Sequence, residues 1–124
     1  MSGTVLREVL DAWRDAIGRH LPDRVAALFT DDAVFQGLHP YTVGRPGVET
    51  YYASQPLGMA VTYDIMQARR LAGDVVLGWV AVEFTFAPGT RPPLPLNLTI
   101  VVRRAGESWQ IAHYHVSHLI DVHE

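Results

Sequence analysis

The second half of the chain constrains the fold most, because it contains four long runs of β-forming residues separated by clusters of Gly or Pro. These runs span residues 60–71, 74–86, 96–104 and 108–120. Gly73-Asp74 and Ala105-Gly106-Glu107 have the composition of hairpin turns, which join neighbouring antiparallel strands. The loop APGTRPPLP is longer and contains four prolines. This pattern predicts an antiparallel meander.

The first half of the chain has the periodicity of helices instead. Apolar residues recur at three- to four-residue spacing over residues 5–17, and Thr4 is a suitable N-cap. A second short helix is expected over residues 23–29, a strand around 33–36, and a third helix that begins near Pro46. Helices followed by a meander predict an α+β fold, with N-terminal helices packed on a strongly curved antiparallel sheet.

Length and composition narrow the class of protein. With 124 residues, the chain is expected to form a single domain over residues 1–124. With a net charge of −3, the chain lacks the basic character of nucleic-acid binders. It also lacks the run of ~18 apolar residues that a membrane-spanning helix needs. The absence of cysteine excludes disulfides and thiolate metal sites and is typical of the cytoplasm. We therefore expect a cytoplasmic protein without nucleic-acid or membrane partners.

The second β-forming run carries apolar residues on both of its faces. Val80, Val82 and Phe84 point to one face. Trp79 and Ala81 point to the other and are apolar too, whereas a sheet with one solvated face alternates apolar with polar residues. This pattern predicts that the outer face packs on a second copy of the chain, in a homodimer. The alternative is a strand covered by a loop.

Two stretches carry a resemblance to a known superfamily. RVAALFTDDAVFQGLHPYTVGRPGVETYY resembles the signature stretch of the nuclear transport factor 2-like superfamily, and GESWQIAHYHVSH is similar to its final strand. The chain most resembles the SnoaL-like polyketide cyclase and ketosteroid isomerase-like branches, and looks closest to small proteins of enediyne and other polyketide gene clusters. The resemblance implies a cone-shaped α+β barrel, a homodimer and a hydrophobic pocket for a small molecule. It does not imply one chemistry, because this fold hosts several enzyme classes and plain binding domains.

Only some of the functional positions of the family are occupied by suitable residues in this chain. Trp13 falls where steroid isomerases place an oxyanion-holding tyrosine, and its indole N–H is a hydrogen-bond donor. Tyr52 matches a supporting tyrosine. The position of the general-base aspartate falls at or next to Gly37, whose neighbour Gln36 is not a base, and that of a second carboxyl falls on Thr99. The catalytic aspartate of the cyclases also has no counterpart, so the resemblance supplies neither mechanism with its carboxylates.

The stretch HYHVSH at residues 113–118 holds three of the six histidines. Successive strand residues alternate faces, so His113 and His115 share one face. The register of the family turns that face outward, toward a second subunit. The opposite face, turned toward the pocket, carries Tyr114, Val116 and His118.

A metal site is the alternative interpretation of these histidines. His113 and His115 form a His-x-His pair, but a metal needs a third ligand, for which Glu83 is the candidate. Without cysteine or a His-Glu-x-x-His helix, the sequence favours histidines packed in the dimer interface. We expect no metal and no cofactor. His123, near the C-terminus, is a further histidine.

The candidate ligand-binding residues are mostly aromatic. They are expected to line an apolar cavity, and the alternative is that they are only core. Asn97 and Thr99 belong to the set because on the concave face of the sheet they would orient a ligand oxygen. The set comprises Trp13, Phe35, Tyr41, Tyr52, Tyr63, Phe84, Phe86, Asn97, Thr99, Tyr114 and Val116.

Three functions remain open. The first is an enzyme of polyketide or other secondary metabolism that performs acid–base isomerisation, cyclisation or dehydration, with His118 or Asp64 as the titrating residue. The second is a non-catalytic module that binds or sequesters a hydrophobic polyene or aromatic ligand. The third is a His-ligated metal enzyme. Burial of His118 or Asp64 in a cavity would favour catalysis, whereas exposure of both would favour binding.

Overall fold

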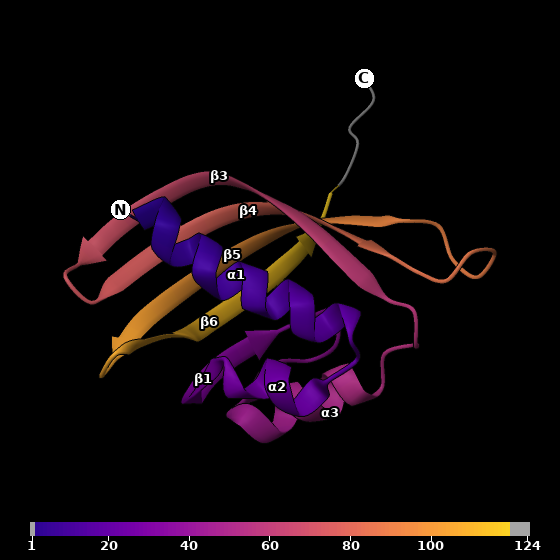
Figure 1. Cartoon of the computed structure of the whole chain (residues 1–124), viewed down its shortest axis with the longest axis horizontal. Helices are drawn as coiled ribbons and strands as arrows, with labels where there is room; N and C mark the ends of the chain where they lie inside the picture. The colour runs from indigo at the N-terminus through magenta and orange to yellow at the C-terminus, as the bar shows by residue number, and fades with distance from the viewer. Residues whose placement is uncertain (1, 120–124) are drawn as a thin grey trace.

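The computed structural model describes residues 2–119, which form three helices and six strands (Figure 1). In chain order they are α1 (Ser2–Gly18), α2 (Pro22–Ala27), β1 (Phe29–Gln36), β2 (Thr42–Val43), α3 (Arg45–Ala53), β3 (Ala60–Ala72), β4 (Val75–Thr85), β5 (Leu94–Ala105) and β6 (Ser108–His118). The strands form one sheet in the order β2-β1-β6-β5-β4-β3. The expected α+β class and the meander of the second half are therefore confirmed.

The sheet is mixed rather than wholly antiparallel, and it is open rather than closed into the cone-shaped barrel that the resemblance implies. β1 runs parallel to β6, while the other neighbouring strands are antiparallel. β2 and β3 form the two edges, and β2 has only two residues, too few to close the sheet against β3. The sheet curves around α1 instead, and α2 and α3 lie beside β1 (Figure 1).

α1 packs on the concave face of the sheet through one apolar stripe. Its buried residues recur at helical spacing and are Leu6, Val9, Leu10, Trp13, Ala16 and Ile17. Gly78 in β4 permits a close approach of the helix, because a Cβ at this position would lie 2.8 Å from Leu6 Cδ1. Within residues 2–119, no helix is long and apolar enough to cross a membrane.

A bulge in β6 sets which of its residues face the core. Ala112 is the extra residue, because Ile111 and His113 pair with consecutive residues of β5. The alternation restarts at this point, and Trp109 packs half-buried against the core. Simple alternation counted back from His113 would turn Trp109 outward, but the extra residue reverses its facing.

β3 contains a similar bulge near its middle. Met66 is the extra residue, because Ile65 and Gln67 pair with consecutive residues of β4. The side chain of Met66 is 57% exposed. The bulge therefore interrupts the pairing at an exposed edge of the sheet.

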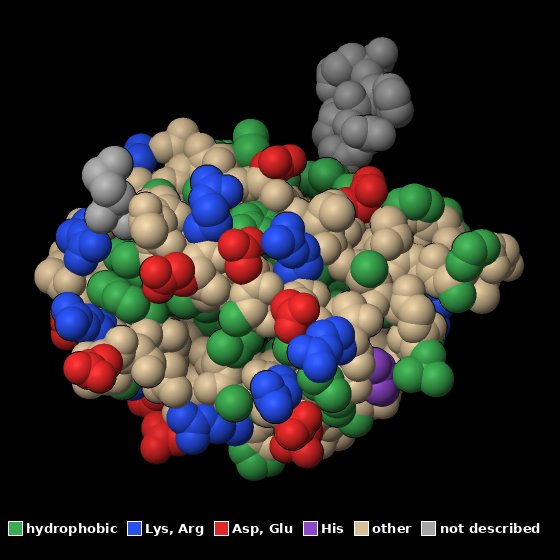
Figure 2. Space-filling view, viewed as in Figure 1, with side chains coloured by type: hydrophobic (Ala, Val, Ile, Leu, Met, Phe, Trp, Pro, Cys, Tyr) green, Lys and Arg blue, Asp and Glu red, His purple; other side chains and the backbone are tan. Residues whose placement is uncertain are grey.

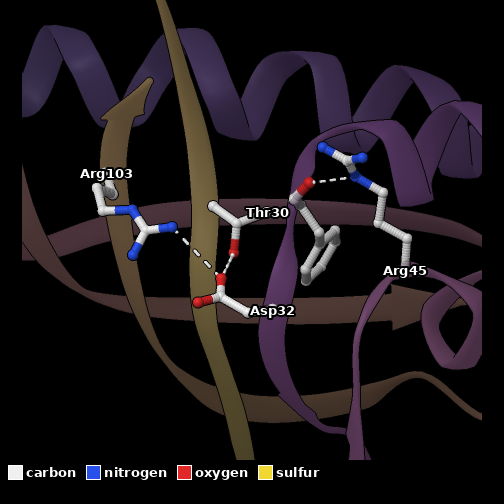
Figure 3. A network of polar contacts seen from close by, with 5 residues as sticks. Thr30, Asp32, Arg45 and Arg103 are labelled. Atoms are coloured by element: carbon white, nitrogen blue, oxygen red, sulfur yellow. Dashed lines mark hydrogen bonds and ion pairs between the residues drawn. The ribbon is translucent and has the colours of Figure 1, made fainter. Parts of the chain in front are cut away.

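A polar network ties β1 to its neighbours (Figure 3). The Thr30 hydroxyl donates to Asp32 Oδ1 at 2.8 Å, and Arg103 of β5 donates to the same oxygen at 3.3 Å. The hydrogen bond from Thr30, followed by the charge of Arg103, holds the pKa of Asp32 below its ordinary value. Arg45 at the start of α3 donates from Nε to the Phe29 backbone oxygen at 2.8 Å, which fixes α3 against β1.

Candidate functional site

Three hydrogen-bonding side chains form a chain through the core. Trp13 Nε1 of α1 donates to the Tyr52 hydroxyl of α3 at 3.2 Å, and that hydroxyl donates to the Tyr114 hydroxyl of β6 at 3.4 Å. All three side chains are buried. Burial raises the pKa of Tyr52 and of Tyr114 well above the ordinary value of a phenol, so both hydroxyls are neutral at physiological pH.

Aromatic rings fill the space around this chain. The Phe35 ring stacks on Tyr114 with centroids 4.7 Å apart, and the Trp13 indole meets Phe84 edge-on at 6.1 Å. A gap of only about 10 Å³ lies beside Tyr52, near the smallest volume that holds one water. The sequence predicts a ligand beside Trp13, but the protein's own aromatic rings occupy this space.

A cavity of about 120 Å³, which we call the mouth cavity, lies at the edge of this core. The loop after β1, the segment after α3 and the β4–β5 connection meet around it. Its lining residues are Leu38, His39, Tyr51, Gln55, Met59, Phe84, Phe86, Arg91, Leu94 and Leu96. Phe84 and Phe86, both predicted to contact a ligand, are thus on a cavity wall.

A second hollow of about 230 Å³, the α3 groove, adjoins the mouth cavity. His39 and Tyr51 line both hollows, and their rings meet edge-on with centroids 5.6 Å apart. The other lining residues of the groove are Phe35, Gly37, Pro40, Thr42, Gly47, Thr50 and Ser54. Phe35 is therefore the third predicted residue on a cavity wall.

The ring of Tyr51 lies against Gly37. A Cβ at Gly37 would lie 3.0 Å from two carbons of the Tyr51 ring, so this ring needs a residue without a side chain at its face. Burial raises the pKa of the Tyr51 hydroxyl, although a hydrogen bond with the Leu38 backbone offsets part of the shift. The position at or next to Gly37, which the resemblance assigns to a carboxylate base, therefore lies against the neutral phenol of Tyr51.

The two predicted titrating residues lie outside both hollows. Asp64 is exposed on β3, where it pairs with Ala81 of β4. His118 ends β6 on the same side as Tyr114 and Val116, but it is exposed whereas those two residues are buried in the core. Neither Asp64 nor His118 lines the mouth cavity or the α3 groove. Exposure of both favours binding over acid–base catalysis.

Asn97 and Thr99 lie on the outer face of the sheet. The β5 residues that alternate with them are buried in the core and are Leu96, Leu98 and Ile100. Thr99 pairs with Trp79 on one side and with His115 on the other, and both partners are exposed. The expected outward facing of Trp79 and His115 is confirmed. The expectation that Asn97 and Thr99 face a ligand on the concave side is wrong.

Two more predicted ligand contacts lie elsewhere. Tyr41 is 63% exposed in the loop between β1 and β2 and lines neither hollow. Tyr63 in β3 donates its hydroxyl to Asp11 of α1, so it joins the helix to the sheet. Burial and then the bond to Asp11 raise the pKa of Tyr63.

His113 and His115 are neighbours on the outer face, with ring centroids 6.2 Å apart. Among residues 2–119, no group of three or more His, Asp or Glu is placed to hold a metal. Glu83 is not beside the pair, because the β4 residue aligned with His115 through β5 is Trp79. His123 lies outside the described residues, and the metal-free state stays a prediction.

Sequence reasoning missed much of the mouth cavity. Gln55, Met59 and Arg91 reach it from connections between elements, where hydrophobic periodicity carries no information. The one signal for Arg91 is its place directly before two prolines, which restrict the backbone of the loop.

Helices on one face of a curved open sheet, with an apolar hollow where they meet, define an NTF2-like α+β protein. More narrowly, the chain belongs to the SnoaL-like domain family, whose sequence profile matches residues 6–121. A search of curated proteins finds no match.

Solved structures share this fold. A ketosteroid isomerase-like protein from Erwinia carotovora atroseptica SCRI1043 is 26% identical, with a TM-score of 0.80 over 95% of this chain and 96% of that one. An NTF-2 like protein of unknown function from Shewanella oneidensis MR-1 is 14% identical, with a TM-score of 0.80 over 94% and 99% of the two chains. A domain with a cystatin-like fold from Nostoc punctiforme PCC 73102 is 18% identical, with a TM-score of 0.83 over 98% and 79%.

Proposed function

We propose that the protein binds a hydrophobic, ring-bearing small molecule without transforming it. The observation that carries this proposal is the pair of adjoining hollows that share His39 and Tyr51. At about 120 and 230 Å³, each is smaller than the roughly 300 Å³ at the lower end of ligand sites, so we expect one ligand to extend across both. Phe35, Phe84 and Phe86 offer it aromatic surface.

We further propose that the ligand is a polyketide, a polyene or another aromatic metabolite. Membership of the SnoaL-like domain family and the aromatic walls of both hollows support this class. A link to enediyne gene clusters and a cytoplasmic location stay predictions from the sequence.

Binding without catalysis is preferred because, among residues 2–119, no Asp or Glu side chain lines either hollow. Acid–base isomerisation is the second candidate function. It is favoured by 26% identity to the ketosteroid isomerase-like protein.

We also propose a homodimer formed through the outer face of the sheet. Trp79 is 49% exposed there, and His113 and His115 lie two strands away on the same face. A large apolar side chain in the middle of an otherwise regular sheet face supports contact with a second copy.

Unbiased mass spectrometry of small molecules that co-purify with the native protein tests the binding proposal. We expect an apolar metabolite with wild type and with Tyr41→Ala, an exposed control, and its loss with Tyr51→Ala, whose folding is checked by thermal unfolding. Incubation of the recovered metabolite with the protein separates the two candidate functions, because only an isomerase changes it. Failure to recover or bind any apolar ring compound would refute the proposal.

A further inference from the structure

The wall of the mouth cavity has an uneven charge. Arg91 contributes a guanidinium, and within the described part of the chain no Asp or Glu side chain lines the cavity. The chain as a whole carries a net charge of −3, so the positive charge of this wall is opposite in sign to the net charge of the chain. Figure 2 shows acidic and basic side chains interspersed over the face that α1 covers. A cationic group beside an apolar cavity therefore sets this site apart.

The loop between β4 and β5 fixes the position of Arg91. Thr90 donates to the Ala87 carbonyl oxygen from its backbone N–H at 3.1 Å and from its hydroxyl at 2.6 Å, which closes a turn. Pro92 follows Arg91 and restricts it to extended backbone conformations. The guanidinium lies over the Phe86 ring, 5.1 Å from its centre. The loop itself projects beyond the sheet (Figure 1).

Arg91 has no carboxylate partner within residues 2–119. Arg14, Arg19 and Arg103, in contrast, each meet an aspartate at 3.5 Å or less. Stacking over an aromatic ring uses the face of the guanidinium and leaves its in-plane N–H donors free. Those donors match the two oxygens of a carboxylate.

We infer that the mouth cavity takes an apolar ring ligand that bears one carboxylate, which pairs with Arg91 while the rings pack on Phe84, Phe86 and Tyr51. The inference rests on the proposed binding function and names the chemical class of its ligand. A single guanidinium matches a monoanion, whereas a phosphate ester carries a charge of about −1.5 to −2 at neutral pH.

Two probes of nearly equal shape, 2-naphthoate and 2-naphthamide, test the inference by calorimetric titration. At low ionic strength we expect wild type to bind the carboxylate more tightly than the amide, because only the carboxylate pairs with the guanidinium. The preference should be only about fivefold, because Arg91 is exposed to solvent. Raising the ionic strength from ~0.01 to ~0.15 M shortens the Debye length from roughly 30 to 8 Å, so this preference should shrink.

Arg91→Gln removes the charge while keeping an N–H donor, and we expect it to bind the two probes equally. Arg70→Gln is the matched control, because Arg70 also lies over an aromatic ring, 5.7 Å from the centre of Trp109, but does not line the mouth cavity. This control should keep the wild-type preference. Unchanged melting temperatures confirm that both variants fold.

Equal binding of the two probes by wild type, or an unchanged preference in Arg91→Gln, overturns the inference and leaves the binding function standing. If neither probe binds, the co-purified metabolite decides: a carboxylate supports the inference, and a neutral molecule overturns it. If no probe binds and no metabolite co-purifies, the inference and the proposed function fail together.

Discussion

The indole N–H of Trp13 and the hydroxyl of Tyr52 meet at 3.2 Å where solvent does not reach, and they join two helices that are far apart in the sequence. The same hydroxyl continues to Tyr114 at 3.4 Å, so it both accepts and donates. A residue with both capacities is needed at position 52, because removal of the hydroxyl leaves the buried indole donor without an acceptor.

Tyr52→Phe should therefore lower the free energy of unfolding by about 1–3 kcal/mol, the cost of a buried unsatisfied donor. Equilibrium unfolding in urea measures the loss. Tyr41→Phe is the control: Tyr41 is 63% exposed, so its stability should match wild type. A Tyr52→Phe protein as stable as wild type would show that this bond does not hold α1 to α3.

Gly37→Ala should displace the Tyr51 ring, because the new Cβ would lie 3.0 Å from it. We expect a stability loss of about 1–3 kcal/mol, as for other overpacked sites, and weaker binding of 2-naphthoate. Gly73→Ala is the control, since a Cβ there meets nothing within 4 Å. Unaltered binding and melting temperature in Gly37→Ala would exclude Tyr51 as a fixed wall.

Asp32→Asn tests the acid dependence of the network on β1. Because Thr30, and next Arg103, lower the pKa of Asp32, its carboxylate stabilises the folded state above the ordinary pKa of 3.8, and this contribution is lost as the pH falls through the lowered value. The melting temperature of wild type should exceed that of Asp32→Asn at neutral pH, and this difference should vanish in acid. Asp31→Asn, an exposed neighbour, should show no such convergence.

His115→Asp should weaken the proposed dimer, because it would bury an unpaired carboxylate against a second copy beside Thr99. Light scattering at micromolar concentration should give twice the chain mass for wild type and a lower mass for the variant. His20→Asp makes the same chemical change in the turn after α1, where φ is 52° and aspartate is tolerated, so it should remain dimeric. A monomeric wild type would contradict the dimer.

Periodicity in the sequence was sufficient to predict the elements that bury one continuous face. The apolar stripe of α1 and the alternation in β4 identify these elements, because every position that faces the core is apolar and recurs with the period of the element. β2 was not predicted, since its two residues carry no period and depend on pairing with Val34 and Phe35 of β1.

Facing was harder to predict than element type. Alternation with Leu96 and Leu98 already indicates that Asn97 and Thr99 point away from the core, and this indication is the correct one. For Trp109 no local signal exists, because the extra residue Ala112 is defined only by the pairing of β6 with β5. The mouth cavity is likewise assembled from separate connections, so its walls follow from the tertiary fold alone.

The bulge at Met66 also bears on how the protein avoids forming fibres. β3 is the long edge of the sheet, and an incoming strand would need an unbroken row of backbone donors and acceptors along it. The extra residue interrupts that row, and Asp64 and Arg69 place charges on either side of the interruption. Deletion of Met66 would restore an even ladder over residues 60–70 of this edge, and such a chain is expected to polymerise strand to strand on storage.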